Sequence, residues 1–332
     1  MIGLAPGIRS GRRLALAVAV WVMGSGCGST PTQPPPPPPQ LSLQCPASLD
    51  VTARDGVTAD VAYTPQLTGG APGASVACTP PSGSSLPLGE SNVSCTASDS
   101  AGQSASCGFV VRVLEPPRLR HTRYLAFGDS ITEGVVSPAP TLLMQLATPQ
   151  AYPGLLQMTL AERYTAQAIE VLNRGVAGER LITGRDRLPD VLDDDLPEVL
   201  LLQEGINNLR NVPTAELAAD FRGMVRTAQR RGVTVLPALL LPVSEAREAG
   251  RPGTQAGIRA FNEEIRRISL DLGCGEPVDL YTLFQQDLSL LGVDGLHPTE
   301  TGYVRIAEAF FEAIKARWEE APAPPPFTLS VR

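Results

Sequence analysis

Short apolar runs alternate with amphipathic stretches along residues 119–320, and this alternation restricts the folds that the chain can adopt. Each run is as long as a buried strand, and the stretches between the runs carry apolar residues at the three- and four-residue spacing of a helix. Strands that alternate with helices form a parallel sheet with helices packed on its faces. The sequence therefore predicts an α/β domain whose strands lie at residues 124–127, 169–172, 199–203, 233–240 and 278–280.

The predicted helices of this domain have recognisable ends. We expect Thr214 to cap one helix, which ends at Gly232, and a second helix to end before Gly273. A last helix is expected to begin at Pro298-Thr299. In a parallel sheet of this kind, the ligand site lies in the short turns after the carboxyl ends of the strands.

Residues 41–115 have a different pattern, with short strand-like runs separated by turns rich in Gly, Pro, Ser and Asp. This pattern predicts a small all-β sandwich. Four of the six cysteines lie in it, at Cys45, Cys78, Cys95 and Cys107. Four cysteines allow three pairings, and their spacing alone does not choose between them. In an exported domain, each bridge would contribute about 2–4 kcal/mol to stability.

Residues 1–27 have the layout of an export signal, in which basic residues precede an apolar run too short to span a bilayer. The run ends in small residues before Cys27 and resembles a bacterial lipobox, although Gly24 stands where leucine is usual. We expect a protein exported to the bacterial cell envelope and anchored through a lipid on Cys27, which would be its only membrane contact. The alternative is cleavage nearby, which would give a periplasmic or secreted protein.

Two proline-rich segments flank the predicted domains. Residues 28–40 form a linker with six consecutive prolines, which would extend over roughly 19 Å at about 3.1 Å per residue. Residues 321–332 form a second proline-rich segment, which we expect to be a disordered tail. The net charge of −7 and the lack of basic clusters argue against a nucleic-acid partner.

A serine follows the first predicted strand, in the sequence Gly128-Asp129-Ser130. Far along the chain, Asp294 stands three residues before His297, which is one of only two histidines. A hydroxyl becomes a useful nucleophile when a base removes its proton, and the base needs a third group to orient it. Because these residues supply the three roles, the sequence predicts ester hydrolysis. Taken singly, the serine could be a helix cap and the histidine a structural residue.

Four blocks of this region closely resemble the SGNH, or GDSL-type, hydrolase family. They are GDSI at 128–131, NRGVAG at 173–178, GINN at 205–208 and DGLH at 294–297. The resemblance covers residues 121–318 and implies a flavodoxin-like, three-layer α/β/α fold. It also implies a catalytic triad of Ser130, Asp294 and His297, with neither a cofactor nor a metal.

The same resemblance implies an oxyanion hole made by the backbone N–H groups of Ser130 and Gly178 and the side-chain amide of Asn207. Attack on an ester carbonyl places negative charge on its oxygen, so donors must already point there. Gly178 suits this role because it has no side chain to obstruct the approach. The alternatives are a turn residue at Asn207 and a helix-entry glycine at Gly178. If the site were inactive, the protein would be a surface adhesion or glycan-binding protein.

Residues 78–111 resemble the hyalin-repeat, or HYR, family, an immunoglobulin-like sandwich of extracellular proteins that is linked to adhesion. The resemblance implies the pairings Cys45–Cys107 and Cys78–Cys95. It implies no chemistry, but it makes a glycan or another surface ligand a partner of residues 41–114.

The substrate is predicted only as an ester, either an acetylated carbohydrate or a lipid. The segment at residues 135–152 is long for a strand-to-helix connection, and its apolar residues need cover. Such a segment is expected to be a lid or pocket wall, or else a short helix packed on the domain. The extracellular address and the HYR-like module favour short-chain or carbohydrate O-acetyl esters. The apolar segment favours longer acyl chains, as in lipases and lysophospholipases.

Several other residues are weaker candidates. Arg180 and Arg185 could meet an anionic or sugar substrate, although solvated arginines are commoner. The run Asp193-Asp194-Asp195 lacks the spacing of a calcium loop and is expected to be a solvated helix end. We expect His121 to be a surface residue of the linker and Cys274 to be a small buried thiol.

Overall fold

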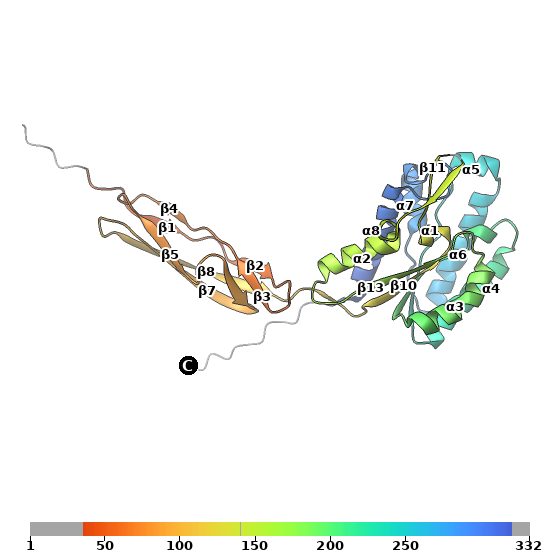
Figure 1. Ribbon diagram of the computed structural model, residues 1–332, viewed down its shortest axis with the longest axis horizontal. Helices are drawn as coiled ribbons and strands as arrows, with labels where there is room; N and C mark the ends of the chain where they lie inside the picture. The colour runs from red at the N-terminus through yellow and green to blue at the C-terminus, as the bar shows by residue number, and fades with distance from the viewer. Residues whose placement is uncertain (1–35, 140, 321–332) are drawn as a thin grey trace, which may run out of the picture.

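The computed structural model describes residues 36–139 and 141–320, which form a strand-rich part and an α/β part (Figure 1). The predicted signal segment with Cys27, the first part of the linker and the C-terminal tail lie outside the described residues. Among the residues that are described, no helix is long and apolar enough to cross a membrane.

The α/β part is built on a four-stranded parallel sheet in the order β13-β10-β14-β15. The strands are β13 (Glu170–Gly175), β10 (Arg123–Gly128), β14 (Val199–Gln203) and β15 (Thr234–Pro237). Alternate residues of the central strand β10 point to opposite faces, and both faces are covered. Tyr124 belongs to one hydrophobic core and Leu125 to the other, and both side chains are fully buried.

Helices cover both faces of this sheet, which completes the three layers (Figure 1). One core contains residues of α2 (Tyr152–Arg163), α7 (Leu280–Gln286) and α8 (Glu300–Trp318). The other contains residues of α3 (Leu181–Asp195), α4 (Thr214–Arg230) and α6 (Thr254–Asp271). The remaining elements are the strands β9 (Arg118–Leu119), β11 (Val135–Ala139), β12 (Leu142–Gln145) and β16 (Glu319–Glu320), the helices α1 (Ser130–Glu133) and α5 (Glu245–Gly250), and the 3₁₀ helices η1 (Thr148–Gln150), η2 (Ile206–Asn208) and η3 (Leu288–Leu290). The predicted fold class is confirmed.

The fifth predicted strand, at residues 278–280, is wrong. It is reduced to one isolated parallel bridge between Ala238 and Val278. The chain then turns into α7 at once, because the Asp279 carboxylate accepts a hydrogen bond from the Thr282 N–H and caps the helix. The predicted strand at 233–240 is correspondingly shorter and ends at Pro237.

Of two helix starts predicted from the sequence, one agrees with the structure and the other does not. Thr299 caps α8 by accepting a hydrogen bond from the Gly302 N–H, as expected from its position. Thr214 does not cap α4. It is the first residue inside the helix, and Pro213 occupies the capping position without a side-chain hydrogen bond.

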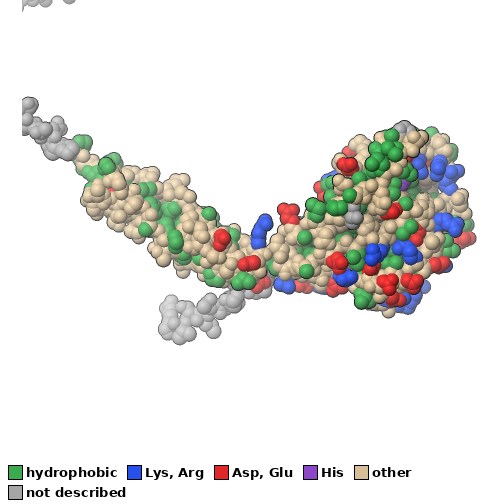
Figure 2. Space-filling view, in the orientation of Figure 1, with side chains coloured by type: hydrophobic (Ala, Val, Ile, Leu, Met, Phe, Trp, Pro, Cys, Tyr) green, Lys and Arg blue, Asp and Glu red, His purple; other side chains and the backbone are tan. Residues whose placement is uncertain are grey.

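The connection at 135–152, for which the sequence predicts a lid, a pocket wall or a short helix, contains a β-hairpin followed by the 3₁₀ helix η1. Its strands are β11 (Val135–Ala139) and β12 (Leu142–Gln145). The apolar side chains of Leu142, Leu143 and Met144 are 47%, 58% and 50% exposed. Figure 2 shows hydrophobic side chains gathered in this region. The hairpin therefore presents an apolar surface to solvent.

The strand-rich part contains a four-stranded sheet and two strand pairs. The sheet has the order β2-β8-β7-β5, with β2 (Leu49–Thr52), β8 (Ser104–Leu114), β7 (Gly89–Ser98) and β5 (Ser75–Thr79). The pairs are β3 (Thr58–Val61) with β6 (Ser84–Pro87), and β1 (Ser42–Gln44) with β4 (Gln66–Thr68). Alternate residues of β7 and β8 are buried in a core of their own, as expected for an all-β sandwich.

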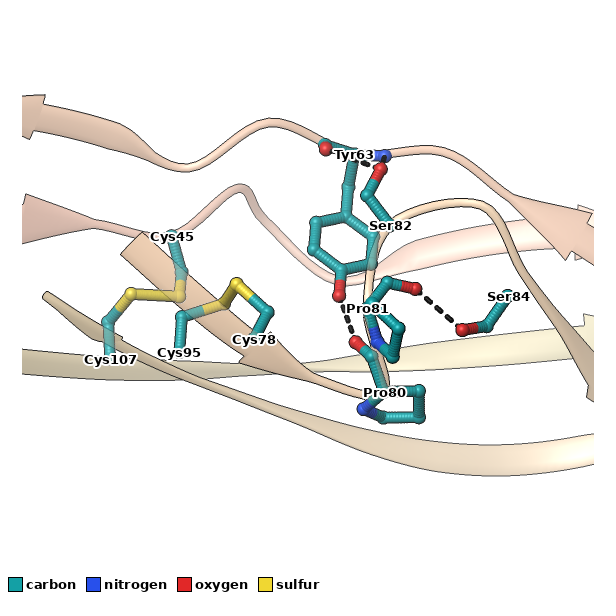
Figure 3. Close-up of a disulfide and its surroundings, with 9 residues drawn as sticks. All are labelled: Cys45, Tyr63, Cys78, Pro80, Pro81, Ser82, Ser84, Cys95 and Cys107. Atoms are coloured by element: carbon teal, nitrogen blue, oxygen red, sulfur yellow. Dashed lines mark hydrogen bonds between the residues drawn. A yellow bond between two sulfur atoms is a disulfide. The ribbon is translucent and has the colours of Figure 1, made fainter. Parts of the chain in front are cut away.

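Two disulfides join the strands of this sandwich, Cys45–Cys107 and Cys78–Cys95 (Figure 3). Cys78 and Cys95 face each other in the ladder of β5 and β7, and Cys95 is also paired in register with Cys107. The two bridges therefore lie side by side. This is the pairing that the HYR resemblance implies.

Candidate active site

Ser130 begins α1 directly beyond the carboxyl end of β10. The turn before it needs a glycine, because a Cβ at Gly128 would lie 2.0 Å from the Gln203 carbonyl oxygen of the neighbouring strand. Asp129 caps α1, since its Oδ1 accepts a hydrogen bond from the Ile131 N–H at 3.0 Å. The sequence thus places the serine at the edge of the sheet where parallel α/β proteins bind ligands.

The structure brings the three predicted triad residues together. The Nε2 of His297 lies 3.0 Å from the Oγ of Ser130, although the two residues are 167 positions apart. The Nδ1 of His297 lies 2.7 Å from the Oδ2 of Asp294. Both Ser130 and His297 are buried, with 5% and 7% exposure. This is the geometry in which a base can take the hydroxyl proton while a carboxylate orients its ring.

Asp294 is held in its charged form by the loop that it shares with His297. Partial burial would raise its pKa, but hydrogen bonds from the His297 ring and from the Leu296 and His297 N–H groups outweigh burial and lower the pKa to about 2. The carboxylate is therefore ionised at neutral pH and can stabilise a protonated His297 ring.

Backbone contacts fix this loop in position. The Gly292 N–H donates to the His297 carbonyl oxygen at 2.7 Å, and the Val293 N–H donates to the Ser137 carbonyl oxygen of β11 at 3.0 Å. Gly295 has a φ of 67°, and a Cβ there would lie 1.9 Å from the Ser244 Oγ. The loop thus depends on both the hairpin and the segment before α5.

Gly178 and Asn207 lie in two loops that are tied together. The Asn207 Nδ2 donates to the carbonyl oxygen of Glu179, which follows Gly178, at 2.9 Å. The Asn208 Oδ1 accepts from the Leu181 N–H at 2.8 Å. An amide nitrogen carries two N–H bonds, and the contact with Glu179 uses one of them. Because Gly178 is exposed and has a φ of 74°, its backbone is free of side-chain cover.

Two further residues position this region, and sequence reasoning assigned no role to either. The Glu133 Oε2 accepts from the Ala177 N–H at 2.6 Å, directly before Gly178. The Asn173 Oδ1 accepts from the Gly175 N–H at 2.9 Å. The only signal in the sequence is that Glu133 lies one helical turn after Ser130 and that Asn173 opens the second block.

Comparisons with known proteins identify the families to which the two parts of the chain are similar. A model of the GDSL-like Lipase/Acylhydrolase family matches residues 126–305, which is more than half of the chain. This chain belongs to the GDSL-like lipase/acylhydrolase family. A model of the HYR domain matches residues 36–113.

Relatives of this GDSL-like protein include two named esterases. Esterase TesA of Pseudomonas aeruginosa is 24% identical over 196 residues, which cover 58% of this chain and 87% of the relative. An arylesterase of Vibrio mimicus is 27% identical over 115 residues, or 34% of this chain. The match spans about half, 52%, of the length of that arylesterase.

Solved structures with the same fold include further enzymes. A lipase/acylhydrolase from Enterococcus faecalis aligns with a TM-score of 0.51 and 21% identity over 61% of this chain and 100% of its own. Est24, a carbohydrate acetylesterase from Sinorhizobium meliloti, aligns with a TM-score of 0.50 and 18% identity over 59% of this chain and 99% of its own. At these identities, the likeness shows the fold alone.

Beside Ser130, this GDSL-like domain contains buried acidic residues. Burial raises the pKa of Asp129 to about 6, although the Ile131 N–H and the charge of His297 act in the opposite direction. Burial, with the charges of Asp129 and Glu179, also raises the pKa of Glu204 well above its usual range. Asp129 Oδ2 and Glu204 Oε2 are buried without a hydrogen-bond partner among the described residues. Burial and the neighbouring acidic groups therefore favour the uncharged form of the Glu204 carboxyl.

Several weaker candidates are engaged elsewhere. Arg185 forms ion pairs with Asp186 and Asp220. Arg180, which lies two residues after Gly178 in the sequence, is exposed. These contacts leave Arg185 without a free charge for a substrate.

The acidic run and the two remaining candidates differ in outcome. Asp195 is not solvated as predicted, because it is buried and accepts two hydrogen bonds from the Arg174 guanidinium. His121 is partly exposed, and its half-buried ring also packs edge-on against Trp318. Cys274 is a buried free thiol, as predicted.

Proposed function

We propose that this protein is an exported serine esterase that hydrolyses carboxylic esters through an acyl-enzyme intermediate. The observation that carries the proposal is the hydrogen-bonded chain from Ser130 through His297 to Asp294. Membership of the GDSL-like lipase/acylhydrolase family supports the same reaction class. Ser130 is the nucleophile, His297 the base and Asp294 the group that orients the base.

In the first half of the reaction, the Ser130 hydroxyl attacks the ester carbonyl while its proton moves to the Nε2 of His297. The carbonyl oxygen becomes negatively charged and meets the N–H groups of Ser130, Gly178 and the Asn207 amide. The Ser130 N–H is open to this role because the first N–H groups of a helix have no partner within it. As the intermediate collapses, His297 returns the proton to the leaving alcohol.

The second half repeats these steps with water as the nucleophile. His297 takes a proton from the water as it attacks the acyl-enzyme, and the same donors stabilise the second oxyanion. The carboxylic acid then leaves and Ser130 recovers its proton. Asp294 stays ionised throughout and stabilises the His297 ring whenever the ring is protonated.

The preferred substrate is a short-chain ester, such as an O-acetyl group on a carbohydrate. The HYR-like sandwich supports this choice, because a glycan or surface ligand bound there would hold the enzyme on a polymer. The exposed apolar residues of the β11–β12 hairpin favour the alternative, a lipase- or lysophospholipase-like esterase. Anchoring through a lipid on Cys27 would place either enzyme at the cell envelope. Loss of labelling by a fatty-acid probe in a Cys27→Ser variant would support the anchor.

Hydrolysis of p-nitrophenyl acetate, butyrate and octanoate by residues 41–332 tests the proposal. We expect Ser130→Ala to abolish turnover while leaving the unfolding transition unchanged, since only the hydroxyl is lost. A falling rate from acetate to octanoate would support the short-chain preference, and a rising rate the lipase-like alternative. If wild type and variant are equally inactive, the protein is instead a surface binding protein with an inactive hydrolase domain.

A further inference from the structure

A small cavity lies directly beside the proposed oxyanion hole. Its wall includes Asn207 of η2 and Leu296, the residue before His297. Its volume is about 140 Å³. Since one water molecule occupies about 30 Å³ of liquid, the cavity has room for a carboxylate or part of a sugar ring but not for a long acyl chain.

Three arginines line the same cavity, Arg210 after η2 and Arg247 and Arg251 at α5. Figure 2 shows basic side chains gathered near α5 and the start of α6. The protein carries a net charge of −7, yet three guanidinium groups line this one cavity of about 140 Å³. The cavity is thus a positive site on an acidic molecule.

The charges of these arginines are only partly neutralised. Arg247 is 20% exposed and lies 3.6 Å from the Asp294 Oδ2, but that oxygen is already bound by His297. The Glu248 carboxylate is near Arg210, yet its two oxygens accept hydrogen bonds from the Gly253 and Gln255 N–H groups at 2.7 Å. Among the described residues, neither Arg210 nor Arg251 has a carboxylate within 4.0 Å.

Arg247 and Arg251 carry like charges at close spacing, and Asp294 offsets this only for Arg247. The Arg251 N–H donates to the Arg247 carbonyl oxygen at 2.9 Å, so the two residues lie one helical turn apart. Like charges at this spacing repel each other. Burial lowers the pKa of Arg247, the charge of Asp294 opposes this, and the charge of Arg251 lowers it further. An anion between the guanidinium groups would relieve the repulsion.

We propose that the cavity lined by Arg210, Arg247 and Arg251 binds a carboxylate on the alcohol part of the substrate, such as that of a uronic acid in an acetylated polysaccharide. This inference rests on the proposed esterase function and narrows its substrate class. Arginine suits the role because its planar guanidinium binds carboxylates through two parallel hydrogen bonds.

The position of the cavity indicates the alcohol side of the ester. The protonated His297 must donate its proton to the leaving oxygen of the ester. The leaving alcohol therefore lies next to the loop that carries His297. Leu296 of that loop and Arg247, which contacts Asp294, both line the cavity. An anionic group a few bonds from the leaving oxygen would therefore reach the arginines.

The test compares phenyl acetate with 4-acetoxybenzoate, which differ by one carboxylate on the leaving group. The variants are Arg210→Gln, Arg251→Gln and their double substitution, which spare Arg247 because it contacts the triad. We expect the double variant to lose about tenfold or more in kcat/KM for 4-acetoxybenzoate, since hydrogen bonds between charged groups are removed. Its kcat/KM for phenyl acetate should stay within about twofold. Arg226→Gln on α4, an exposed arginine outside the cavity, is the control for charge loss.

Equal losses on both substrates, or none on either, would overturn the inference. A selective loss on mono-(4-nitrophenyl) succinate would also overturn it, because that carboxylate lies on the acyl side. A selective loss on a lysophospholipid, without one on acetylated oligogalacturonide, would replace the uronate by a lipid phosphate.

A binding measurement separates this inference from the proposed reaction. In the Ser130→Ala background, calorimetric titration with acetylated oligogalacturonide should show binding that Arg210→Gln and Arg251→Gln weaken and Arg226→Gln does not. If wild type fails to hydrolyse phenyl acetate, the esterase proposal fails whatever this titration shows. If phenyl acetate is hydrolysed but no arginine-dependent binding is seen, only the anion site fails.

Discussion

Two aspartates beside the proposed nucleophile have pKa values shifted in opposite directions, and burial and hydrogen bonding together account for the difference. Asp294 accepts three hydrogen bonds from its own loop, and its pKa is about 2. Asp129 is fully buried, one of its oxygens has no partner among the described residues, and its pKa is about 6. The depth of burial and the number of hydrogen-bond donors that face each carboxylate therefore set its pKa.

Glu204 gives a stability prediction at the same scale. Its folded-state pKa lies above the unfolded value, so the folded protein binds more protons and loses stability as pH rises above about 4.5. Glu204→Gln removes this titration, and we expect it to be close to neutral near pH 4 and stabilising by about 1–3 kcal/mol at pH 8. Urea unfolding at both pH values measures the difference.

Glu263→Gln, an exposed change in α6, is the matched control and should shift neither value. A Glu204→Gln variant that is less stable than wild type at pH 8 would mean that the ionised carboxylate has a partner in the folded protein.

The candidate nucleophile and base could be predicted from the sequence. The residues that hold the surrounding loops in place could not. Ser130 and His297 are recognisable because they lie in two of four sequence blocks that together resemble one family. Glu133 and Asn208 hold the neighbouring loops through single hydrogen bonds to backbone N–H groups. Any acidic or amide residue on a surface could do this, so their role becomes visible only when the chain is folded.

At the scale of elements, α1 and β13 depend on a close backbone contact. A Cβ at Gly175 would lie 2.1 Å from the backbone nitrogen of Glu133, so α1 would have to move. Because Ser130 begins α1, we expect Gly175→Ala to lower kcat for p-nitrophenyl acetate by about tenfold or more and to reduce the melting temperature. Rates and thermal unfolding of the same preparation measure both effects.

Gly223→Ala in α4 is the control for an added methyl group. A Cβ there would meet only the Arg185 Cδ at 3.8 Å, and alanine favours a helix by about 0.5–1 kcal/mol over glycine. This variant should keep full activity and melt slightly higher. Full activity in Gly175→Ala would show that α1 tolerates displacement.

The elements that sequence reasoning missed are those decided by capping and backbone contacts that hydropathy does not record. Residues 278–280 read as a strand by hydropathy, but the Asp279 cap starts a helix instead. The hairpin at residues 135–145 lacks the alternation of a half-buried strand, because Leu142, Leu143 and Met144 are all exposed. Its antiparallel pairing is set by backbone contacts that hydrophobic patterning does not record.

At the scale of the whole molecule, the chain has separate hydrophobic cores. One contains only residues between Leu41 and Val113, and the other two contain only residues between Leu119 and Trp318. The spacing of four cysteines could not choose a pairing, whereas likeness to the HYR family did. Because all four belong to the first core region, the disulfides restrain the sandwich and leave the hydrolase domain unconstrained.

This separation predicts the result of deleting residues 41–114. The proposed triad, the proposed oxyanion donors and their supporting contacts all lie beyond residue 118, so kcat/KM for p-nitrophenyl acetate should stay within about twofold of the full chain. On an acetylated, insoluble polysaccharide, we expect a loss of about tenfold or more if the sandwich holds the enzyme on its polymer, because effective concentration falls without tethering. Release of acetate from the polymer and from the soluble ester, measured in parallel, checks both. Equal activity on the polymer would assign the sandwich to adhesion alone, and loss on the soluble ester would mean that the hydrolase core needs the sandwich to fold.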